Sequence, residues 1–319
     1  MLASVCVSFT MTASALAETK WDMPTPYGDS VFHTMNISQF ADDVRAATGG
    51  ELDITVHSAG SLFGHAEIKY SVRRGLAPIG ELLMSRLANE DPVFAVDSIP
   101  FLASSYDEAE NLWAASRPAV EEKLAAQGLQ LLFAVPWPGQ SLYVKEDVTD
   151  VAQMEGVTFR AYNSATERLA QLMGAVPTQV ETGDIPTAFS TGRVSAMITS
   201  PSTGASSQAW DFVSNYIDTQ AWLPKNMVVV NKQAFDALPE DQQSALLAAA
   251  AEAETRGWDM SASETAAKIA VLTENGMTVS QPSEALKSQL LEIGSTMVAE
   301  WLETAGDEGK AIVDAYRTQ

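Results

Sequence analysis

The chain has 319 residues, of which 46% are hydrophobic and 19% charged, a balance that argues against wholesale disorder. Its formal net charge is −22, with 19 Lys+Arg against 41 Asp+Glu. Nucleic acids and anionic membranes require clustered cations, so this composition argues against both as partners and favours a soluble monomer. The length allows two domains, each with its own core.

The N-terminus has the pattern of a secretory signal peptide. Residues 1–17 are small and apolar and end in Ala15-Leu16-Ala17, an A-x-A cleavage pattern, although no Lys or Arg precedes the apolar run. A start codon assigned too late would explain that gap. A buried N-terminal helix and a lipoprotein cleavage at Cys6 are the alternatives. Cys6 is the only cysteine, so the mature chain would contain none, and an exported protein of the bacterial periplasm is expected.

Strand and helix patterns alternate along the chain. The first half predicts strands at residues 20–23, 52–57, 77–84 and 130–135, and helices at 30–48, 65–74, 105–115 and 117–127. The second half predicts extended segments at 141–145, 157–160, 175–180, 196–199, 227–231 and 277–279, and helices at 148–154, 165–173, 185–191 and 210–216.

The rest of the chain is helical. Residues 239 to the early 270s predict one helix of more than 30 residues, and a last helix runs from residue 283 to the C-terminus. We therefore predict an α/β protein of two lobes with a hinged cleft and a long helix spanning both. The predicted lobe I comprises residues 18–136 plus 226–265, and lobe II comprises residues 137–225 plus 266–319.

No familiar catalytic or cofactor motif is present. The chain lacks a glycine-rich dinucleotide fingerprint, a P-loop and a G-x-S-x-G elbow, so no cofactor and no catalytic residue is expected. A metal site at His57, His65 and Glu67 is conceivable but lacks recognised zinc spacing, so no metal is expected either. An exported enzyme on the same two-lobed scaffold stays an alternative.

Polar and aromatic residues follow the ends of several predicted strands, where open α/β proteins place their ligands. Arg160 is the strongest candidate, because it ends a strand just before a helix start and carries a planar five-donor cation suited to a carboxylate. A structural ion pair is the alternative role for this arginine. The candidate ligand-binding residues are Arg160, Trp137, Gln140, Tyr162, Ser200, Thr199, Trp222, Lys225, Glu81, Phe63 and Tyr27.

Several ordered blocks resemble a known family. They are Gly156-Val157-Thr158-Phe159-Arg160, Gly174-Ala175-Val176-Pro177-Thr178 and Thr187-Ala188-Phe189-Ser190-Thr191-Gly192-Arg193-Val194, together with Asp97-Ser98-Ile99-Pro100-Phe101-Leu102. Their order and separations resemble the solute-binding proteins of TRAP transporters, of the DctP type. The resemblance implies a periplasmic-binding-protein-like fold and a receptor that captures an organic acid and delivers it to a sodium-coupled membrane permease.

The same resemblance implies site residues. Arg160 matches the family arginine that pairs bidentately with the ligand carboxylate. Ser200 stands where an asparagine is common, and Gln140 stands where some members have a second arginine. These two departures argue against a sialic-acid-like ligand and against a typical C4-dicarboxylate.

The candidate residues narrow the ligand further. One strong cation without a second arginine suits a monocarboxylate, and Trp137, Tyr162, Phe63 and Trp222 could supply flat walls for an aromatic or otherwise planar group. Lys225 could meet a second acceptor. Each aromatic could instead be a core residue. A C4-dicarboxylate or an aliphatic keto or hydroxy acid is the alternative ligand, and a chaperone-like interaction protein is the alternative function.

Overall fold

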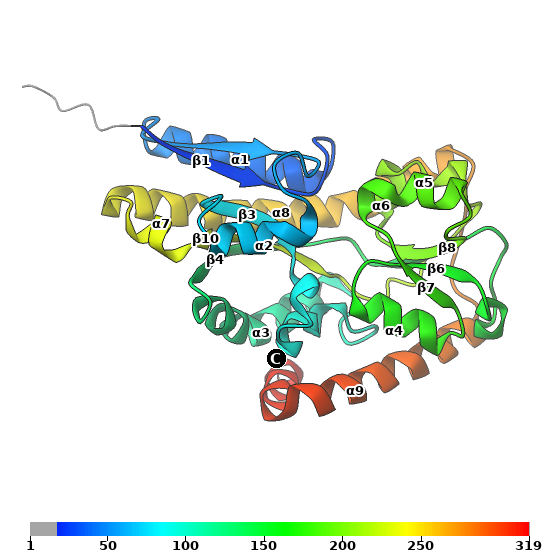
Figure 1. Cartoon of the computed structure of the whole chain (residues 1–319). Helices are drawn as coiled ribbons and strands as arrows, with labels where there is room; N and C mark the ends of the chain where they lie inside the picture. The colour runs from blue at the N-terminus through cyan, green and yellow to red at the C-terminus, as the bar shows by residue number, and fades with distance from the viewer. Residues whose placement is uncertain (1–17, 319) are drawn as a thin grey trace, which may run out of the picture.

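A computed structural model describes residues 18–318, so the predicted signal peptide at residues 1–17 lies outside the described chain. Two α/β lobes lie side by side and are connected by two long helices (Figure 1). The predicted fold class is therefore confirmed. Within the described residues, every helix is too short or too polar to cross a lipid bilayer.

Lobe I contains two small sheets. Its first sheet pairs two parallel strands, and its second has the order β3-β10-β4 with β10 antiparallel to both neighbours. The strands are β1 (Thr19–Pro24), β2 (Leu52–His57), β3 (Ile79–Leu83), β4 (Leu129–Pro136) and β10 (Lys225–Asn231). The helices are α1 (Phe32–Ala47), α2 (His65–Arg73), α3 (Tyr106–Ala125) and α7 (Lys232–Asp236), with 3-10 turns η1 (Met84–Leu87) and η2 (Pro92–Ser98).

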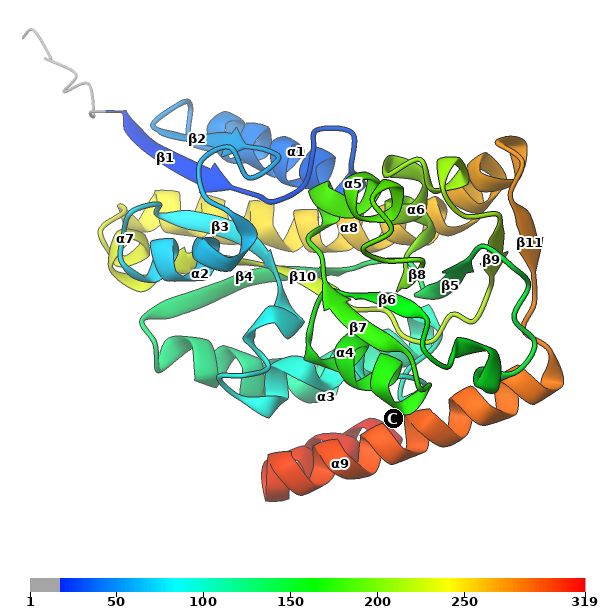
Figure 2. The same cartoon turned by 45° about the vertical axis from the view of Figure 1, so that its right-hand side comes forward.

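Lobe II is built on one mixed sheet with the order β11-β9-β5-β8-β6-β7. Its strands are β5 (Ser141–Val144), β6 (Thr158–Ala161), β7 (Val176–Gln179), β8 (Ala196–Thr199), β9 (Asn215–Ile217) and β11 (Thr278–Ser280). Its helices are α4 (Ser164–Leu172), α5 (Ile185–Ser190) and α6 (Pro201–Ser206), with 3-10 turns η3 (Val151–Met154), η4 (Thr182–Asp184) and η5 (Ala209–Asp211). The parallel strands β6 and β7 pack on α4 (Figure 2).

The predicted long helix is confirmed as α8 (Glu240–Glu274), whose 35 residues span about 52 Å at 1.5 Å per residue. It packs against α1 and β4 in lobe I and against α6 and β11 in lobe II. It lies against β4 at Gly257, where a Cβ atom would lie 2.4 Å from Val135 Cγ2. A glycine is therefore needed for α8 to lie this close to the sheet.

The last helix, α9 (Glu284–Arg317), also contacts both lobes. Its first half packs on η3 and α4, and its second half packs on η2 and α3. The Trp301 indole donates to the Pro92 carbonyl at 2.7 Å, and the Tyr316 hydroxyl donates to the Leu102 carbonyl at 3.0 Å. The end of the chain therefore packs on lobe I, whereas the sequence places all of residues 266–319 in lobe II.

Two local predictions are wrong. The helix predicted at residues 210–216 is instead the short turn η5 followed by β9, because Tyr216 packs on Tyr143 with ring centroids 5.0 Å apart and the backbone pairs with β5 and β11. The two helices predicted between residues 105 and 127 form the single helix α3, which continues through Pro118. Pro118 cannot donate to a carbonyl in the preceding turn, and the nearby Ser116 hydroxyl donates to the Leu112 carbonyl at 2.8 Å.

Candidate functional site

A narrow cavity lies between the lobes, and its atom-free space, including its opening to solvent, is about 390 Å³. Side chains from lobe I, from lobe II and from the crossing segments between them form its walls. It is lined by Tyr27, His65, Leu83, Trp137, Gln140, Arg160, Tyr162, Glu181, Thr182, Thr199, Ser200, Thr203 and Pro224. Seven of the eleven predicted ligand-binding residues are in this lining.

Arg160 is the cation of the cavity. It is the next-to-last residue of β6 with 2% of its surface exposed, and its Nε donates to the Val180 carbonyl at 3.0 Å. Its Nη1 is buried and has no hydrogen-bond partner among the described residues. Burial lowers the pKa of Arg160 to about 10, so the guanidinium remains charged at neutral pH. A buried cation with a free donor is suited to bind an anion that enters the cavity.

Tyr162 and Gln140 hold each other in place beside this cation. The centre of the Tyr162 ring is 5.0 Å from the Arg160 Cζ atom, within the range of a cation–π contact. The Tyr162 hydroxyl donates to Gln140 Oε1 at 3.0 Å, and Gln140 Nε2 donates to the Pro138 carbonyl at 3.0 Å. Both side chains are therefore oriented before any ligand arrives.

An aromatic wall from Tyr27 and Trp137 lines lobe I's side of the cavity. Their ring centroids are 5.0 Å apart at an angle of 65°. Asn226 fixes both rings, because its Oδ1 accepts from the Tyr27 hydroxyl at 3.2 Å and from the Trp137 indole at 3.0 Å. This wall gives the cavity a flat apolar surface on the lobe I side.

Thr199 and Ser200 lie at the end of β8 and are both buried. The Ser200 hydroxyl accepts from the Thr203 amide at 3.1 Å and so caps α6. The Ser200 carbonyl accepts from the Tyr143 hydroxyl at 3.1 Å. Ser200 is therefore already engaged in local hydrogen bonds at the edge of the cavity.

Two predicted residues from the later crossing lie outside the cavity lining. The Lys225 ammonium lies 5.9 Å from the Trp113 ring and 5.7 Å from the Trp258 ring, between α3 and α8. This placement does not support the predicted contact with a second ligand acceptor. Trp222 is fully buried in the core cluster, and its indole Nε1 has no hydrogen-bond partner among the described residues.

Glu81 and Phe63 also lie outside the lining. Glu81 is buried beneath the aromatic wall, where its Oε2 accepts from the Thr25 hydroxyl at 2.6 Å. Burial raises the pKa of this carboxyl to about 7. Phe63 is half-buried in the loop between β2 and α2 and packs on the core. The structure therefore gives these two residues packing and support roles.

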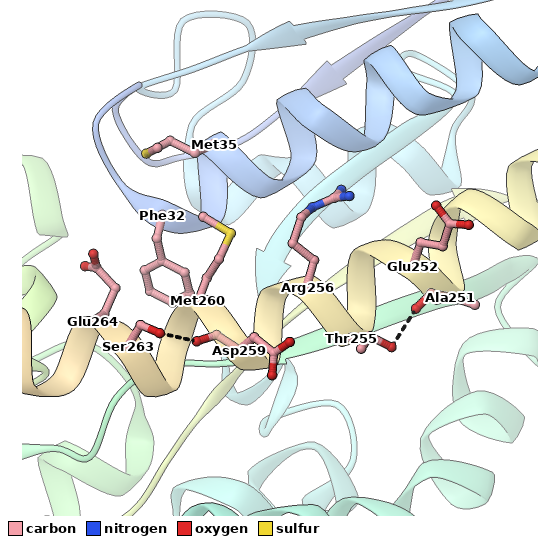
Figure 3. A pocket seen from close by; sticks show the side chains of 10 residues that line it. All are labelled: Phe32, Met35, Ala251, Glu252, Thr255, Arg256, Asp259, Met260, Ser263 and Glu264. Atoms are coloured by element: carbon pink, nitrogen blue, oxygen red, sulfur yellow. Dashed lines mark hydrogen bonds between the residues drawn. The ribbon is translucent and has the colours of Figure 1, made fainter.

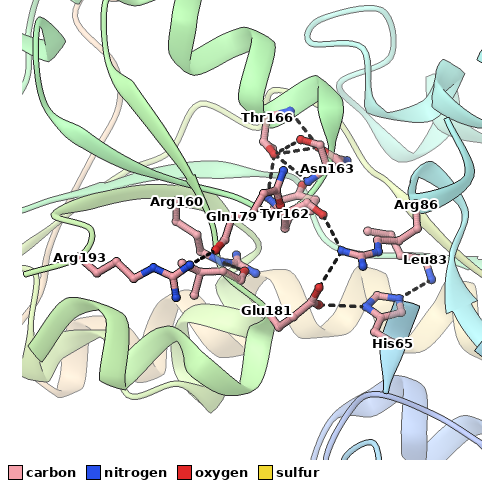
Figure 4. Close-up of polar contacts among 11 residues, drawn as sticks. His65, Leu83, Arg86, Arg160, Tyr162, Asn163, Thr166, Gln179, Glu181 and Arg193 are labelled. Atoms are coloured by element: carbon pink, nitrogen blue, oxygen red, sulfur yellow. Dashed lines mark hydrogen bonds and ion pairs between the residues drawn. The ribbon is translucent and has the colours of Figure 1, made fainter. Parts of the chain in front are cut away.

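Sequence reasoning missed the residues that follow β7. Glu181 and Thr182 line the cavity and follow β7 after Val180, at the same edge of the sheet as the end of β6. The sequence offers His65 as a possible metal ligand and as part of a turn that faces the cleft, but not as a chosen ligand-binding residue. In the structure the His65 ring faces Glu181 at the edge of the cavity (Figure 4). His57 instead contacts Asp22 at 2.7 Å. Among the described residues, no group of three or more His, Cys, Asp or Glu side chains is arranged to hold a metal.

A larger hollow of about 1240 Å³ lies between α1 and α8 (Figure 3). Its lining includes the carboxylates of Glu252, Asp259 and Glu264. Its one arginine, Arg256, is already bound to Asp43 at 2.9 Å. This hollow therefore lacks a free cation for a carboxylate ligand, unlike the interlobe cavity.

A two-lobed α/β fold with a buried arginine in the interlobe cavity defines the class of solute-binding proteins. Residues 27–304 match the family described as bacterial extracellular solute-binding protein, family 7 (DctP). The chain belongs to this family, whose members are extracytoplasmic solute receptors of TRAP transporters. The resemblance seen in the sequence is confirmed.

Three solved structures are especially similar. Two are the Bordetella pertussis extracytoplasmic solute receptors DctP6 and DctP7, described as binding pyroglutamic acid. They share 44% and 46% identity with this chain, cover 94% of it and 100% and 99% of their own length, and each has a TM-score of 0.93. The third is a TRAP solute-binding protein from a marine metagenome, described as specific for pyroglutamate. It has 43% identity, covers 95% of this chain and 100% of its own, and has a TM-score of 0.93.

Proposed function

We propose that this receptor binds a small cyclic monocarboxylate of the pyroglutamate type in the interlobe cavity and releases it unchanged. The observation that carries the proposal is the free Nη1 of Arg160, a buried charged donor in a small cavity. Three similar receptors are described as binding pyroglutamate, which supports a ligand with one ring and one carboxylate. Pyroglutamate's flat lactam ring is consistent with the planar ligand expected from the sequence.

The cavity's chemistry suits such a molecule. Its carboxylate would pair with Arg160, and its ring would lie against the wall of Tyr27 and Trp137. Glu181 adds a negative charge to the lining, which disfavours a ligand with a second carboxylate. A dicarboxylate is therefore expected to bind more weakly than a monocarboxylate of similar size.

The receptor is proposed to act in the periplasm, after removal of residues 1–17, as a monomer that delivers its ligand to the membrane permease of a TRAP transporter. Support comes from the family and from the A-x-A pattern before Glu18. Capture without catalysis is proposed because the family consists of solute receptors.

Calorimetry with four matched compounds tests the ligand. Pyroglutamate should bind; 2-pyrrolidinone, which lacks the carboxylate, and proline, which lacks the ring carbonyl and carries a charged nitrogen, should bind at least tenfold more weakly. Benzoate carries the same single negative charge as pyroglutamate but has an aromatic ring, so it tests whether the site prefers an aromatic ligand. Tighter binding of benzoate than of pyroglutamate would contradict the lactam assignment, and turnover of pyroglutamate would contradict the receptor role.

A further inference from the structure

Three charged or polar side chains form contacts between lobe I and lobe II at the edge of the cavity (Figure 4). Glu181 follows β7 in lobe II, whereas His65 lies in α2 and Arg86 in η1 of lobe I. Arg86 Nη1 is 2.8 Å from Glu181 Oε1, and His65 Nδ1 is 3.5 Å from Glu181 Oε2. Arg86 Nη1 also donates to the Tyr162 carbonyl at 3.3 Å. We call Glu181, His65 and Arg86 the cross-lobe clasp.

Hydrogen bonding within lobe I orients His65. Its Nε2 accepts from the Leu83 amide at 3.2 Å, so the hydrogen of a neutral ring lies on Nδ1 and points toward Glu181. Burial lowers the pKa of His65, which keeps the ring neutral at neutral pH. The His65 hydrogen bond and the Arg86 charge lower the pKa of Glu181 to about 2, so its carboxylate stays ionised. Glu181 is thus an acceptor in lobe II that faces two donors in lobe I.

The clasp adjoins the ligand but is not identical with the carboxylate site. His65 and Glu181 line the cavity, and Arg86 stands behind them with 20% of its side chain exposed. The contacts of Glu181 with His65 and Arg86, and that of Arg86 with the Tyr162 carbonyl, join one lobe to the other, so opening the cleft must break all of them. Arg160, by contrast, makes its hydrogen bond to Val180 within lobe II, so this bond does not depend on whether the cleft is open or closed.

We propose that Glu181, His65 and Arg86 are positioning residues that hold the two lobes closed and set how long the ligand stays bound. The clasp breaks when the cleft opens, so these residues affect mainly the rate at which the ligand dissociates. Because Glu181 and Arg86 are partly exposed, removing one partner should accelerate release by about three- to tenfold. The release readout rests on the proposed ligand, whereas lobe closure does not.

Ligand release is measured by stopped-flow fluorescence with pyroglutamate for Arg86→Met, Glu181→Gln and the double variant. Each single variant should release about three- to tenfold faster, and the double variant no faster than the faster single. The association rate of Arg86→Met, whose residue lies outside the cavity lining, should stay within about twofold of wild type. The control is Asp53→Asn, which breaks the 2.6 Å Arg45–Asp53 pair inside lobe I and should not change release. Unchanged release in Arg86→Met, or fully additive effects in the double variant, would overturn the proposal.

A second readout does not need the ligand. The only cysteine is Cys6 in the predicted signal peptide, so the mature chain can carry a spin-label pair at Leu76→Cys in lobe I and Val176→Cys in lobe II, which are 63% and 51% exposed. In ligand-free protein, Arg86→Met should broaden the interlobe distance distribution and shift its centre relative to the labelled wild type. If wild type does not bind pyroglutamate, the ligand proposal fails. An unchanged distance distribution in Arg86→Met overturns the clasp whether or not pyroglutamate binds.

Discussion

Replacement of Arg160 should separate ligand binding from stability. Arg160→Lys keeps the positive charge but loses the planar fork, and with it at least one charge-assisted hydrogen bond to the carboxylate. Such a bond contributes about 1.5–3 kcal/mol, which corresponds to a roughly 10- to 150-fold weaker Kd. Arg160→Met removes the charge as well, so we expect no measurable binding of a monocarboxylate.

The same residue should destabilise the ligand-free protein. Burial lowers the pKa of Arg160 from 12.5 to about 10, a penalty on the charged form on the order of 3 kcal/mol. The hydrogen bond to Val180 offsets about 1 kcal/mol of this. Arg160→Met should therefore raise the melting temperature of the ligand-free protein by roughly 4 °C.

Calorimetry with pyroglutamate and thermal unfolding without ligand check the two halves of this prediction. Arg168→Met is the control, because Arg168 pairs with Glu300 on the surface and lies outside the cavity lining. Retention of wild-type affinity in Arg160→Lys would refute the proposal that the Arg160 guanidinium binds the ligand carboxylate. A lower melting temperature in Arg160→Met would refute the burial argument.

Two further predictions concern residues around the cavity. In the unfolded chain the Glu81 carboxyl loses its proton near pH 4.5, whereas burial raises its pKa to about 7 in the folded protein. The stability that this group contributes is therefore fully present below pH 4.5 and is lost as the pH rises to 7. The advantage of Glu81→Gln over wild type in urea unfolding should therefore grow from pH 4.5 to 7 by on the order of 3 kcal/mol; a constant difference would contradict the buried acid. In calorimetry, Phe63→Ala should change ligand affinity less than about twofold and Trp137→Ala weaken it more than about tenfold, since only Trp137 lines the cavity; equal effects would contradict this placement.

Local patterns were enough to find the long helix and the cavity arginine. An Ala/Glu-rich stretch whose apolar residues recur at helical spacing predicts α8, and this pattern can be seen within the segment itself. Arg160 could be found because it ends a strand immediately before a helix start, and parallel strands converge at one sheet edge. Both inferences depend only on short segments of sequence.

The strand-end rule could not tell which face of a strand meets the ligand. Side chains alternate along β10, so Asn226 faces the cavity wall while its neighbour Lys225 faces α3 and α8. Which of the two points inward depends on strand pairing between distant segments. The same limit explains β9, whose partners β5 and β11 lie far away in the sequence. The cross-lobe clasp was missed because Arg86 and Glu181 meet only through tertiary packing.

The position of β10 has a consequence for the order of folding. β10 lies between β3 and β4 in lobe I, and it pairs Asn226 with Leu83, yet it follows most of lobe II along the chain. The sheet of lobe I therefore cannot be completed until residues 225–231 have been synthesised. Pairings over such long sequence separations form slowly. The lobe that begins the chain therefore stays incomplete until one of its last strands has been made.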